Sequence, residues 1–280
     1  MSPLSLDEIV RQVQDLPSPP AVVMELLASV DTDEVDLSVL ARKVSHDQAL
    51  SAKMLRMANS SRFGLQVKVT TVQQAITFLG FQSTRELITA AALTGCFAAG
   101  ACDGFDDQAF WRHSLATAVC ACVLARHLRI NQGYAFTAGL LHDIGRLVLV
   151  STAPQRYADV IAWRRANDGE LLEAERAVLG VDHVAAGVAL AQHWNFSDTI
   201  RLAIAHHHDP ATPGAGLLAS IIHVANAIVH ALDLAREQEE LVPPVSSLAW
   251  RALGLSEADY LQVFRETEVQ FDEAASVLIG

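Results

Sequence analysis

The sequence predicts an all-α protein built from two helical subdomains. Signals for helix starts occur along most of the chain, and the apolar residues that follow them recur at spacings of three and four. A convincing alternation of apolar and polar residues, which would indicate a half-buried strand, is found nowhere in the 280 residues. With 51% hydrophobic content, a chain of this length can bury a large core and is expected to divide in two.

Four tetrapeptides match the capping box, in which a Ser or Thr side chain accepts from the third backbone N–H and a Glu or Gln reaches back. They are SLDE at 5–8, SHDQ at 45–48, TVQQ at 71–74 and STRE at 83–86. The prolines at 19–20 predict another helix start, because proline is favoured in the first turn. Gly80 and Gly145 stand where glycine would end a helix as its C-terminal cap.

The small, acidic, glycine-containing stretch at 98–108 is the predicted boundary between the subdomains. We therefore expect an N-terminal helical subdomain at 1–100 and a second one at 101–280 that ends in a helical tail. A charged loop is predicted at 236–247, before the closing helix.

The net charge of −12 argues against general nucleic-acid binding, because a phosphate backbone must be neutralised by Lys and Arg. One segment, 42–68, departs from this acidic average. It is interpreted as a solvated helical face rather than a DNA-binding surface, given the acidic whole. Against the single acid Asp47 it carries Arg42, Lys43, Lys53, Arg56, Arg62 and Lys68.

The N-terminus has neither the basic start nor the apolar run of a signal peptide, and no segment offers the roughly 20 uninterrupted apolar residues of a membrane span. Four cysteines in a chain of this length form no paired framework, so we expect them to be reduced and buried. The sequence therefore predicts a cytoplasmic protein.

His142 and Asp143 stand side by side in FTAGLLHDIGRLVLV (136–150), a stretch that is otherwise mostly apolar. Burying a neutral polar group without a partner costs roughly 2–7 kcal/mol, so something must compensate for this pair. A metal ion, a hydrogen-bonded core pair and the remnant of a lost active site are three explanations that the doublet alone leaves open.

Further polar residues lie on separate predicted helices of the second half. Small residues near His183, such as Gly187, would let a neighbouring helix approach that side chain closely. Together, imidazoles and a carboxylate from several helices suit Fe, Mn, Zn or Ni. Taken singly, each histidine is better explained as a core or surface residue satisfied by a backbone carbonyl or a helix end. The further polar residues of the second half are His113, His183, His206, His207 and His208, together with the stripe of His223, Asn226 and His230 on one predicted helix.

The order His113, His142–Asp143, His183, His207–His208 resembles the HD superfamily of metal-dependent phosphohydrolases, in particular its HD-GYP branch. The first half narrows the resemblance to the related HDOD family, and this resemblance covers roughly residues 12 to 235, most of the chain. The segments that carry this resemblance are LPSPPAVVMELLASVD, LARKVSHDQALSAKMLRMANSSRFG and TTVQQAITFLGFQSTRELI. HDOD proteins are bacterial signalling modules that are generally regarded as non-catalytic, so the resemblance implies an HD-like second subdomain and a regulatory role.

The chain departs from the active HD pattern at several positions. Asn226 stands where active relatives have a metal-binding aspartate, and DPATPGAG after His208 lacks the GYP element. Arg146 replaces a lysine that can meet substrate phosphate in active relatives, and Arg could still do that work. The resemblance thus implies a partly retained metal site formed by His113, His142, Asp143, His183, His207 and His208, or no metal at all.

Three functions remain. The first is a non-catalytic HDOD module that acts on signalling proteins in trans. The second is a metal-dependent phosphodiesterase, in which Asp143 and Arg146 would serve catalysis and bound water would be activated by one or two ions. The third is a DNA-binding regulator that uses the basic segment 42–68. The missing aspartate and the missing GYP element favour the first over the second, and the net charge disfavours the third.

Overall fold

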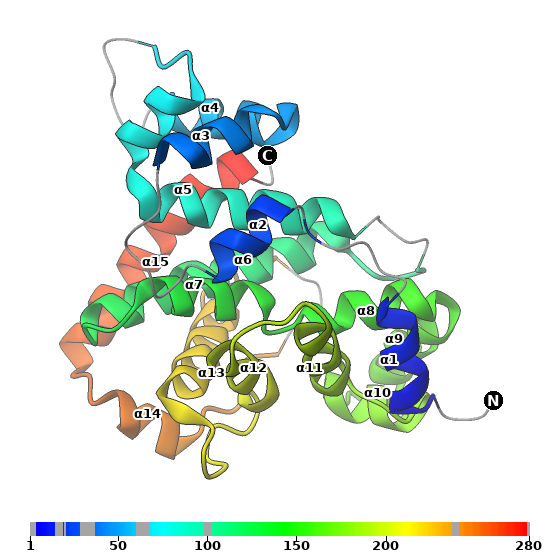
Figure 1. Cartoon of the computed structure of the whole chain (residues 1–280). Helices are drawn as coiled ribbons and strands as arrows, with labels where there is room; N and C mark the ends of the chain where they lie inside the picture. Colours follow the sequence, from blue (N-terminus) through cyan, green and yellow to red (C-terminus); the bar gives the residue numbers. More distant parts are fainter. Residues whose placement is uncertain are drawn as a thin grey trace.

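The computed structural model describes residues 4–14, 19, 21–28, 37–59, 68–97, 102–236 and 241–278. Within these residues the chain forms helices and no strand, so the all-α prediction is confirmed (Figure 1). None of the described helices is both long and apolar enough to cross a membrane. The helices are α1 (Leu6–Gln14), α2 (Ala21–Ala28), α3 (Leu37–Ser45), α4 (Gln48–Ala58), α5 (Val72–Cys96), α6 (Asp107–His127), α7 (Gln132–Leu141), α8 (Ile144–Thr152), α9 (Pro154–Asn167), α10 (Leu171–Leu179), α11 (His183–His193), α12 (Asp198–His206), α13 (Gly216–Ala231), α14 (Ser247–Leu253) and α15 (Glu257–Leu278).

Helices α2 to α5 share a small apolar core, in which Val23, Val44, Met54 and Ile76 are buried. Helices α3 and α4 pack against α5 and lie at the top of Figure 1. The last helix, α15, also contacts α4 and α5, and Leu278 at its end packs against this core. The C-terminal helix therefore joins the small core to the rest of the molecule.

A larger core surrounds α6, which is buried along almost its whole length and packs against α7, α13 and α15. Helix α1 belongs to this second core, because Ile9 and Val13 are buried in it and α1 packs against α11 and α8. The chain passes from one core to the other close to the predicted boundary at 98–108, of which residues 98–101 lie outside the described part. The division into 1–100 and 101–280 stays a prediction.

Two of the four predicted capping boxes are present. Ser5 and Glu8 hydrogen-bond reciprocally at the start of α1. Thr71 and Gln74 form the same arrangement at the start of α5. At both places the sequence pattern and the helix start coincide, because every group of the motif lies within four residues of chain.

The other two capping predictions are wrong. At 45–48 the cap of α4 is Asp47, whose carboxylate accepts from the backbone N–H of Leu50 at 3.0 Å. STRE at 83–86 lies inside α5. That helix is interrupted at Gly80, whose φ of 78° places it in the left-handed region, and it resumes directly afterwards. The predicted break at Gly80 is therefore confirmed, while the new start lies earlier than the motif indicates.

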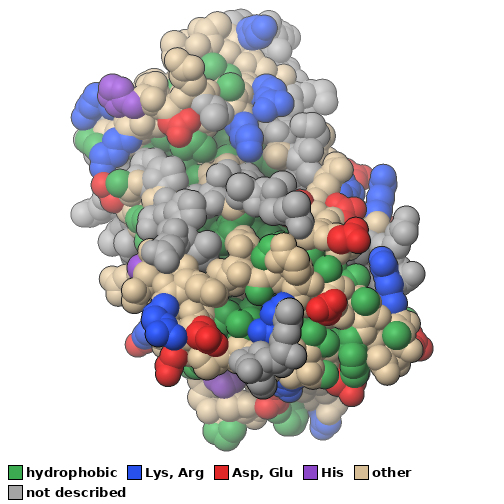
Figure 2. All heavy atoms as spheres, turned by 90° about the vertical axis from the view of Figure 1, so that its right-hand side faces the viewer, with side chains coloured by type: hydrophobic (Ala, Val, Ile, Leu, Met, Phe, Trp, Pro, Cys, Tyr) green, Lys and Arg blue, Asp and Glu red, His purple; other side chains and the backbone are tan. Residues whose placement is uncertain are grey.

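Most of the basic segment 42–68 lies on α3 and α4. Arg42, Arg56 and Lys68 are exposed, and Lys43 forms an ion pair with Glu25 on α2, while Arg62 lies outside the described residues. In Figure 2, Lys and Arg side chains predominate in the upper part of the molecule, whereas acidic and basic side chains alternate in the lower part. This exposed and partly paired helical face agrees with the interpretation of segment 42–68 as a solvated surface.

Candidate metal centre

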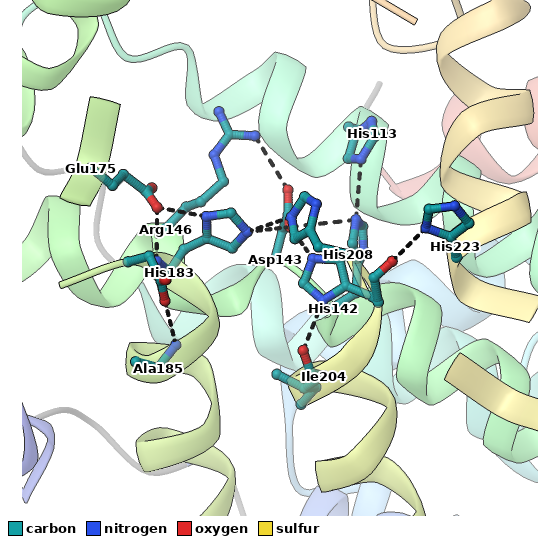
Figure 3. A network of polar contacts seen from close by, with 12 residues as sticks. His113, His142, Asp143, Arg146, Glu175, His183, Ala185, Ile204, His208 and His223 are labelled. Carbon is teal, nitrogen blue, oxygen red and sulfur yellow. Dashed lines mark hydrogen bonds and ion pairs between the residues drawn. The ribbon is translucent and has the colours of Figure 1, made fainter. Parts of the chain in front are cut away.

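The six residues predicted as metal ligands meet at one place, although they come from four segments of the chain (Figure 3). His113 lies inside α6, and His142 and Asp143 stand between α7 and α8. His183 begins α11, and His207 and His208 directly follow α12. Their ligand atoms form two groups, and within each group these atoms lie within 4.8 Å of one another. One group is Asp143, His183, His207 and His208, and the other is His113, His142 and Asp143.

Asp143 belongs to both groups and stands at their centre. Its Oδ1 atom lies 3.3 Å from Nε2 of His207, 3.4 Å from Nε2 of His183 and 3.6 Å from Nε2 of His142. Its Oδ2 atom lies 3.4 Å from the Nη1 atom of Arg146. A single carboxylate therefore serves three imidazoles through one oxygen and a guanidinium through the other.

The break between α7 and α8 and one close helix contact create this arrangement. Asp143 precedes α8 with φ −101° and ψ 11°, outside the regular helix. Gly145 follows in the first turn of α8, so the prediction that it ends a helix is wrong. A Cβ atom at Gly145 would overlap the carbonyl oxygen of His183 and lie 2.5 Å from the backbone nitrogen of Gly187. The absent side chain lets α8 touch the small-residue face of α11, which brings His183 to Asp143.

Backbone carbonyl groups orient two of the imidazoles. The Nδ1–H group of His142 donates to the carbonyl of Gly139 at 2.7 Å, and that of His207 donates to the carbonyl of Ile204 at 2.8 Å. Each bond fixes the tautomer and leaves the Nε2 lone pair directed toward Asp143. These are the outer contacts that metal-binding histidines usually make.

A third imidazole is oriented by Glu175 on α10, a residue that the sequence analysis missed. Glu175 is fully buried, and its Oε2 atom accepts from the backbone N–H and from Nδ1–H of His183, at 2.8 and 2.7 Å. Tyr157 donates its hydroxyl to Oε1 at 3.2 Å. A carboxylate behind a ligating histidine is a recurrent second layer of metal sites, since it orients the ring and raises its basicity.

The donor atoms fit a divalent ion. Nε2 of His113 faces Nε2 of His142 at 3.2 Å, and Nε2 of His183 faces Nε2 of His208 at 3.0 Å. Two imidazole nitrogens bound to one zinc-like ion at about 2.0–2.1 Å also lie about 3 Å apart. Imidazole with carboxylate is a donor set for Fe, Mn, Zn or Ni, so this cluster could bind a metal whose identity the donor atoms leave open.

The electrostatics of the cluster keep His113, His142 and Asp143 in the form that binds metal, and they shift His183 toward its protonated form. Burial lowers the pKa of His142 to about 4 and the pKa of His113 well below its ordinary value, so both rings are neutral near pH 7. Burial would raise the pKa of the Asp143 carboxyl, but its interactions with the rings of His142 and His183, and with the Arg146 guanidinium, hold that pKa well below its usual value. Burial would lower the pKa of His183, but Glu175 and Asp143 outweigh it and raise that pKa.

The three residues of the polar stripe on α13 have different surroundings. His223 is structural, because its Nδ1–H donates to the carbonyl of His207 and its Nε2 accepts from the backbone N–H of Ser246. Asn226 is nearly buried, and its Oδ1 atom has no hydrogen-bond partner among the described residues. The ring centroid of His230 lies 4.8 Å from that of His113, and the two ring planes are tilted by 50°.

A cavity of about 330 Å³ lies over the cluster. Asp143, His183 and His208 line it from the cluster, and Asn226 and His230 line it from α13. Since the cavity has the size of a small-molecule site, the centre is open to a ligand as well as to an ion.

We expect Glu175→Gln to weaken Mn²⁺ or Zn²⁺ binding by roughly 10- to 100-fold, because His183 loses the carboxylate that orients it. The pKa of His183, followed by NMR, should fall in the same variant, since Glu175 raises it in the native protein. Glu173→Gln is the matched control, because Glu173 is exposed on the same helix. Equal metal affinity in the two variants would show that Glu175 serves only the fold.

Comparisons with known proteins identify the family and the fold of this chain. The sequence model of the HDOD domain family matches residues 16–210. A solved HDOD domain protein of unknown function from Geobacter sulfurreducens superimposes with a TM-score of 0.81 over 98% of both chains, at 22% identity. A Shewanella amazonensis protein, whose assignment as a phosphohydrolase is provisional, superimposes with a TM-score of 0.68 over 92% of this chain and 97% of its own, at 27% identity.

Ribonuclease Y of Thermus thermophilus is 31% identical over 163 residues, which are 56% of this chain and 24% of that protein. The chain spans less than half the length of the curated relatives it matches. The family match ends at residue 210, before α13, so Asn226 lies outside the matched region.

Proposed function

This chain belongs to the HDOD family, and we propose that it is a regulatory signalling module that binds a divalent metal ion without hydrolysing phosphoesters. One observation carries the proposal. Five imidazoles converge on the carboxylate of Asp143, and three of these rings are already oriented by Gly139, Ile204 and Glu175. Helix α13 presents the amide of Asn226 to the same cavity. In active relatives of the pattern that this chain resembles, a metal-binding aspartate stands at the position of Asn226.

The charge of the cluster supports ion binding of modest strength. Neutral imidazoles and the one ligating carboxylate of Asp143 would leave a divalent ion with a net charge of roughly +1. The positive charge of Arg146 beside that carboxylate and the carboxylate of Glu175 behind His183 offset each other. Uncompensated charge in a buried site is costly. A carboxylate at position 226 would offset it, and the amide of Asn226 does not.

The position of the centre supports a regulatory role. A bound ion would link α6, the α7–α8 junction, α11 and the end of α12, which together form much of the larger core. Helix α7 contacts α5, and α6 packs against α15, which also reaches the small core. Ion binding would stabilise one arrangement of these helices, because a ligand that prefers one state shifts the population toward it. Signalling proteins in trans would then recognise that state.

A metal-dependent phosphodiesterase is the second candidate. It is favoured by the shared carboxylate of Asp143, which two groups of ligands surround, and by the cavity above it. Ions held there would polarise a phosphoryl oxygen or activate water, while Arg146 would orient a phosphate and Asp143 would hold the ions. The likeness to ribonuclease Y and to the Shewanella protein supports this candidate. DNA recognition through 42–68 has no comparable support, since most of that segment is a partly paired helical face.

We expect the native protein to bind Mn²⁺ weakly and Asn226→Asp to bind it at least about tenfold more tightly, since the added carboxylate offsets the charge of the ion. Calorimetric titration of both proteins at a pH of about 7.5, roughly one unit above the reference pKa of histidine, measures this difference. Asn167→Asp on α9 is the control, because Asn167 is exposed and lies outside both ligand groups.

The same preparations decide between the two candidates. With Mn²⁺, Fe²⁺ or Mg²⁺ supplied, we expect no turnover of bis(p-nitrophenyl) phosphate or cyclic di-GMP by the native protein. Steady hydrolysis that disappears in a His142→Ala, Asp143→Ala double variant would replace the regulatory proposal by the enzymatic one. Native affinity as high as that of Asn226→Asp, or no binding by either protein, would contradict a partly retained metal site.

A further inference from the structure

A second cavity, of about 430 Å³, adjoins the cavity over the metal centre. The two share five lining residues, so they are lobes of one hollow. We call the lobe over the cluster the metal lobe and the other the arginine lobe. The shared residues are Arg146, Arg164, Gly169, Leu171 and Leu241.

The arginine lobe collects positive charge in an acidic protein. Arg146, Arg164, Arg165 and Arg236 line it, whereas the chain as a whole carries a net charge of −12. Two carboxylates, Asp106 and Asp168, line the same lobe. The Asp106 carboxylate accepts from the backbone N–H of Ala109 as the cap of α6. The positive end of the helix dipole therefore partly compensates the charge of Asp106. Four guanidinium groups therefore outnumber two carboxylates around one small hollow.

These arginines come from three different elements. Arg164 and Arg165 stand in the last turn of α9, Arg146 lies in α8, and Arg236 follows α13. Arg146 is buried, and its guanidinium lies 5.5 Å from the ring centre of Phe110 and 5.7 Å from that of Phe105. The Arg146 guanidinium, at the junction of the two lobes, therefore lies between these two aromatic rings and the carboxylate of Asp143.

Apolar side chains complete the walls. Phe105, Tyr157 and Ile161 line the arginine lobe, and Leu241 and Val242 line the metal lobe. Leu241 and Val242 remain 63% and 56% exposed, which is unusual for large apolar side chains beside a cavity. A hollow with several guanidinium groups and an apolar wall fits a ligand that combines phosphates with a planar apolar body, because guanidinium binds phosphate in a bidentate manner.

We propose that this hollow binds a nucleotide with two or more phosphate groups, with one phosphate at the metal lobe and another at the guanidinium groups of Arg165 and Arg236. The part played by the metal lobe rests on the proposed function, whereas the arginine lobe acts independently of it. Lobes of about 330 and 430 Å³ suit a small molecule, and the net charge of −12 disfavours a polynucleotide. The nucleotide would be the signal that the module reads.

The test is a binding titration of the full chain with ADP, ATP, pyrophosphate and adenosine, with and without Mn²⁺. We expect ADP or ATP to bind more tightly than pyrophosphate or adenosine, and Mn²⁺ to strengthen that binding. An Arg165→Gln, Arg236→Gln double variant should bind the nucleotides at least about tenfold more weakly, since each lost phosphate contact removes a charge-assisted bond. Its affinity for Mn²⁺ alone should stay native, because both residues line only the arginine lobe. Arg11→Gln, an exposed arginine on α1, is the matched control.

The outcomes separate this inference from the proposed function. Binding of Mn²⁺ without binding of any nucleotide would overturn the inference and leave the proposed function standing. Nucleotide binding that depends on Arg165 and Arg236 in a protein that binds no Mn²⁺ would support the arginine lobe and overturn the metal centre. Native nucleotide affinity in the double variant, or pyrophosphate binding as tightly as ADP, would overturn the inference.

Discussion

Replacement of Asp143 by asparagine is expected to weaken Mn²⁺ and Zn²⁺ binding by more than about 100-fold, beyond the range that loss of an outer contact usually causes. Asp143 is the one carboxylate shared by both groups of ligands, and its Oδ1 atom lies within 3.6 Å of Nε2 atoms from three histidines. Asparagine keeps the size of the side chain but removes the charge that offsets the ion. Calorimetric titration with each metal measures the loss.

Asp159→Asn is the control for this substitution, because Asp159 is exposed on α9 and lies outside both ligand groups. Circular dichroism of the two metal-free variants checks that the helices are retained. Metal affinity that is equal in the two variants would show that ions bind elsewhere. His142 and Asp143 would then be a hydrogen-bonded pair in the core, as one of the three initial explanations of the doublet holds.

The helices and the candidate ligands could be predicted because their signals are local or resemble a known pattern. The caps at Ser5 and Thr71 depend on groups within four residues of one another, so the printed sequence contains all of them. The helix ends that present His183 and His207 are marked by Asp182 and by the Asp–Pro pair at 209–210. That these residues share one site was inferred from the order of the family pattern, since no local signal brings α6 to α12.

Features that depend on contacts between distant helices could not be predicted. Glu175 lies eight residues before His183 and looks like any acid on a helix, yet it is fully buried against Nδ1 of that ring. Helix α10 carries two acids, Glu173 and Glu175, and nothing in the sequence distinguishes the buried one until α10 and α11 are packed. The convergence of Arg165 and Arg236 is likewise invisible in the chain, because about seventy positions separate them.

The misinterpretation of Gly145 has the same origin. A glycine at the end of an apolar run is typical of a helix C-terminus, and the sequence alone favours that interpretation. In the structure Gly145 is needed for a different reason, which is the contact of α8 with the backbone of α11. Glycine ends helices through its freedom of φ, but here it serves through the absence of a side chain.

Gly145→Ala is therefore expected to lower the free energy of unfolding by about 3 kcal/mol, at the upper end of the usual cost of overpacking. The added Cβ atom would overlap the carbonyl oxygen of His183, which belongs to the backbone and can move only if α8 and α11 separate. Such a separation would also lengthen the 3.4 Å distance between Oδ1 of Asp143 and Nε2 of His183. Metal affinity should fall together with stability. Denaturant unfolding without metal, followed by a Mn²⁺ titration, measures the two effects separately.

Gly187→Ala provides a matched comparison, because it adds one methyl group to the opposite side of the same helix contact. Its Cβ atom would lie 3.2 Å from Cγ2 of Ile204 and 3.3 Å from the backbone nitrogen of Gly145. A side-chain methyl group can shift by a few tenths of an ångström, so this variant should lose no more than about 1.5 kcal/mol, in the lower part of the usual range for overpacking. The expected order is native protein, then Gly187→Ala, then Gly145→Ala, both for stability and for metal affinity. If Gly145→Ala were as stable as Gly187→Ala and bound Mn²⁺ equally well, the approach of α8 to α11 would not be what holds Asp143 against His183.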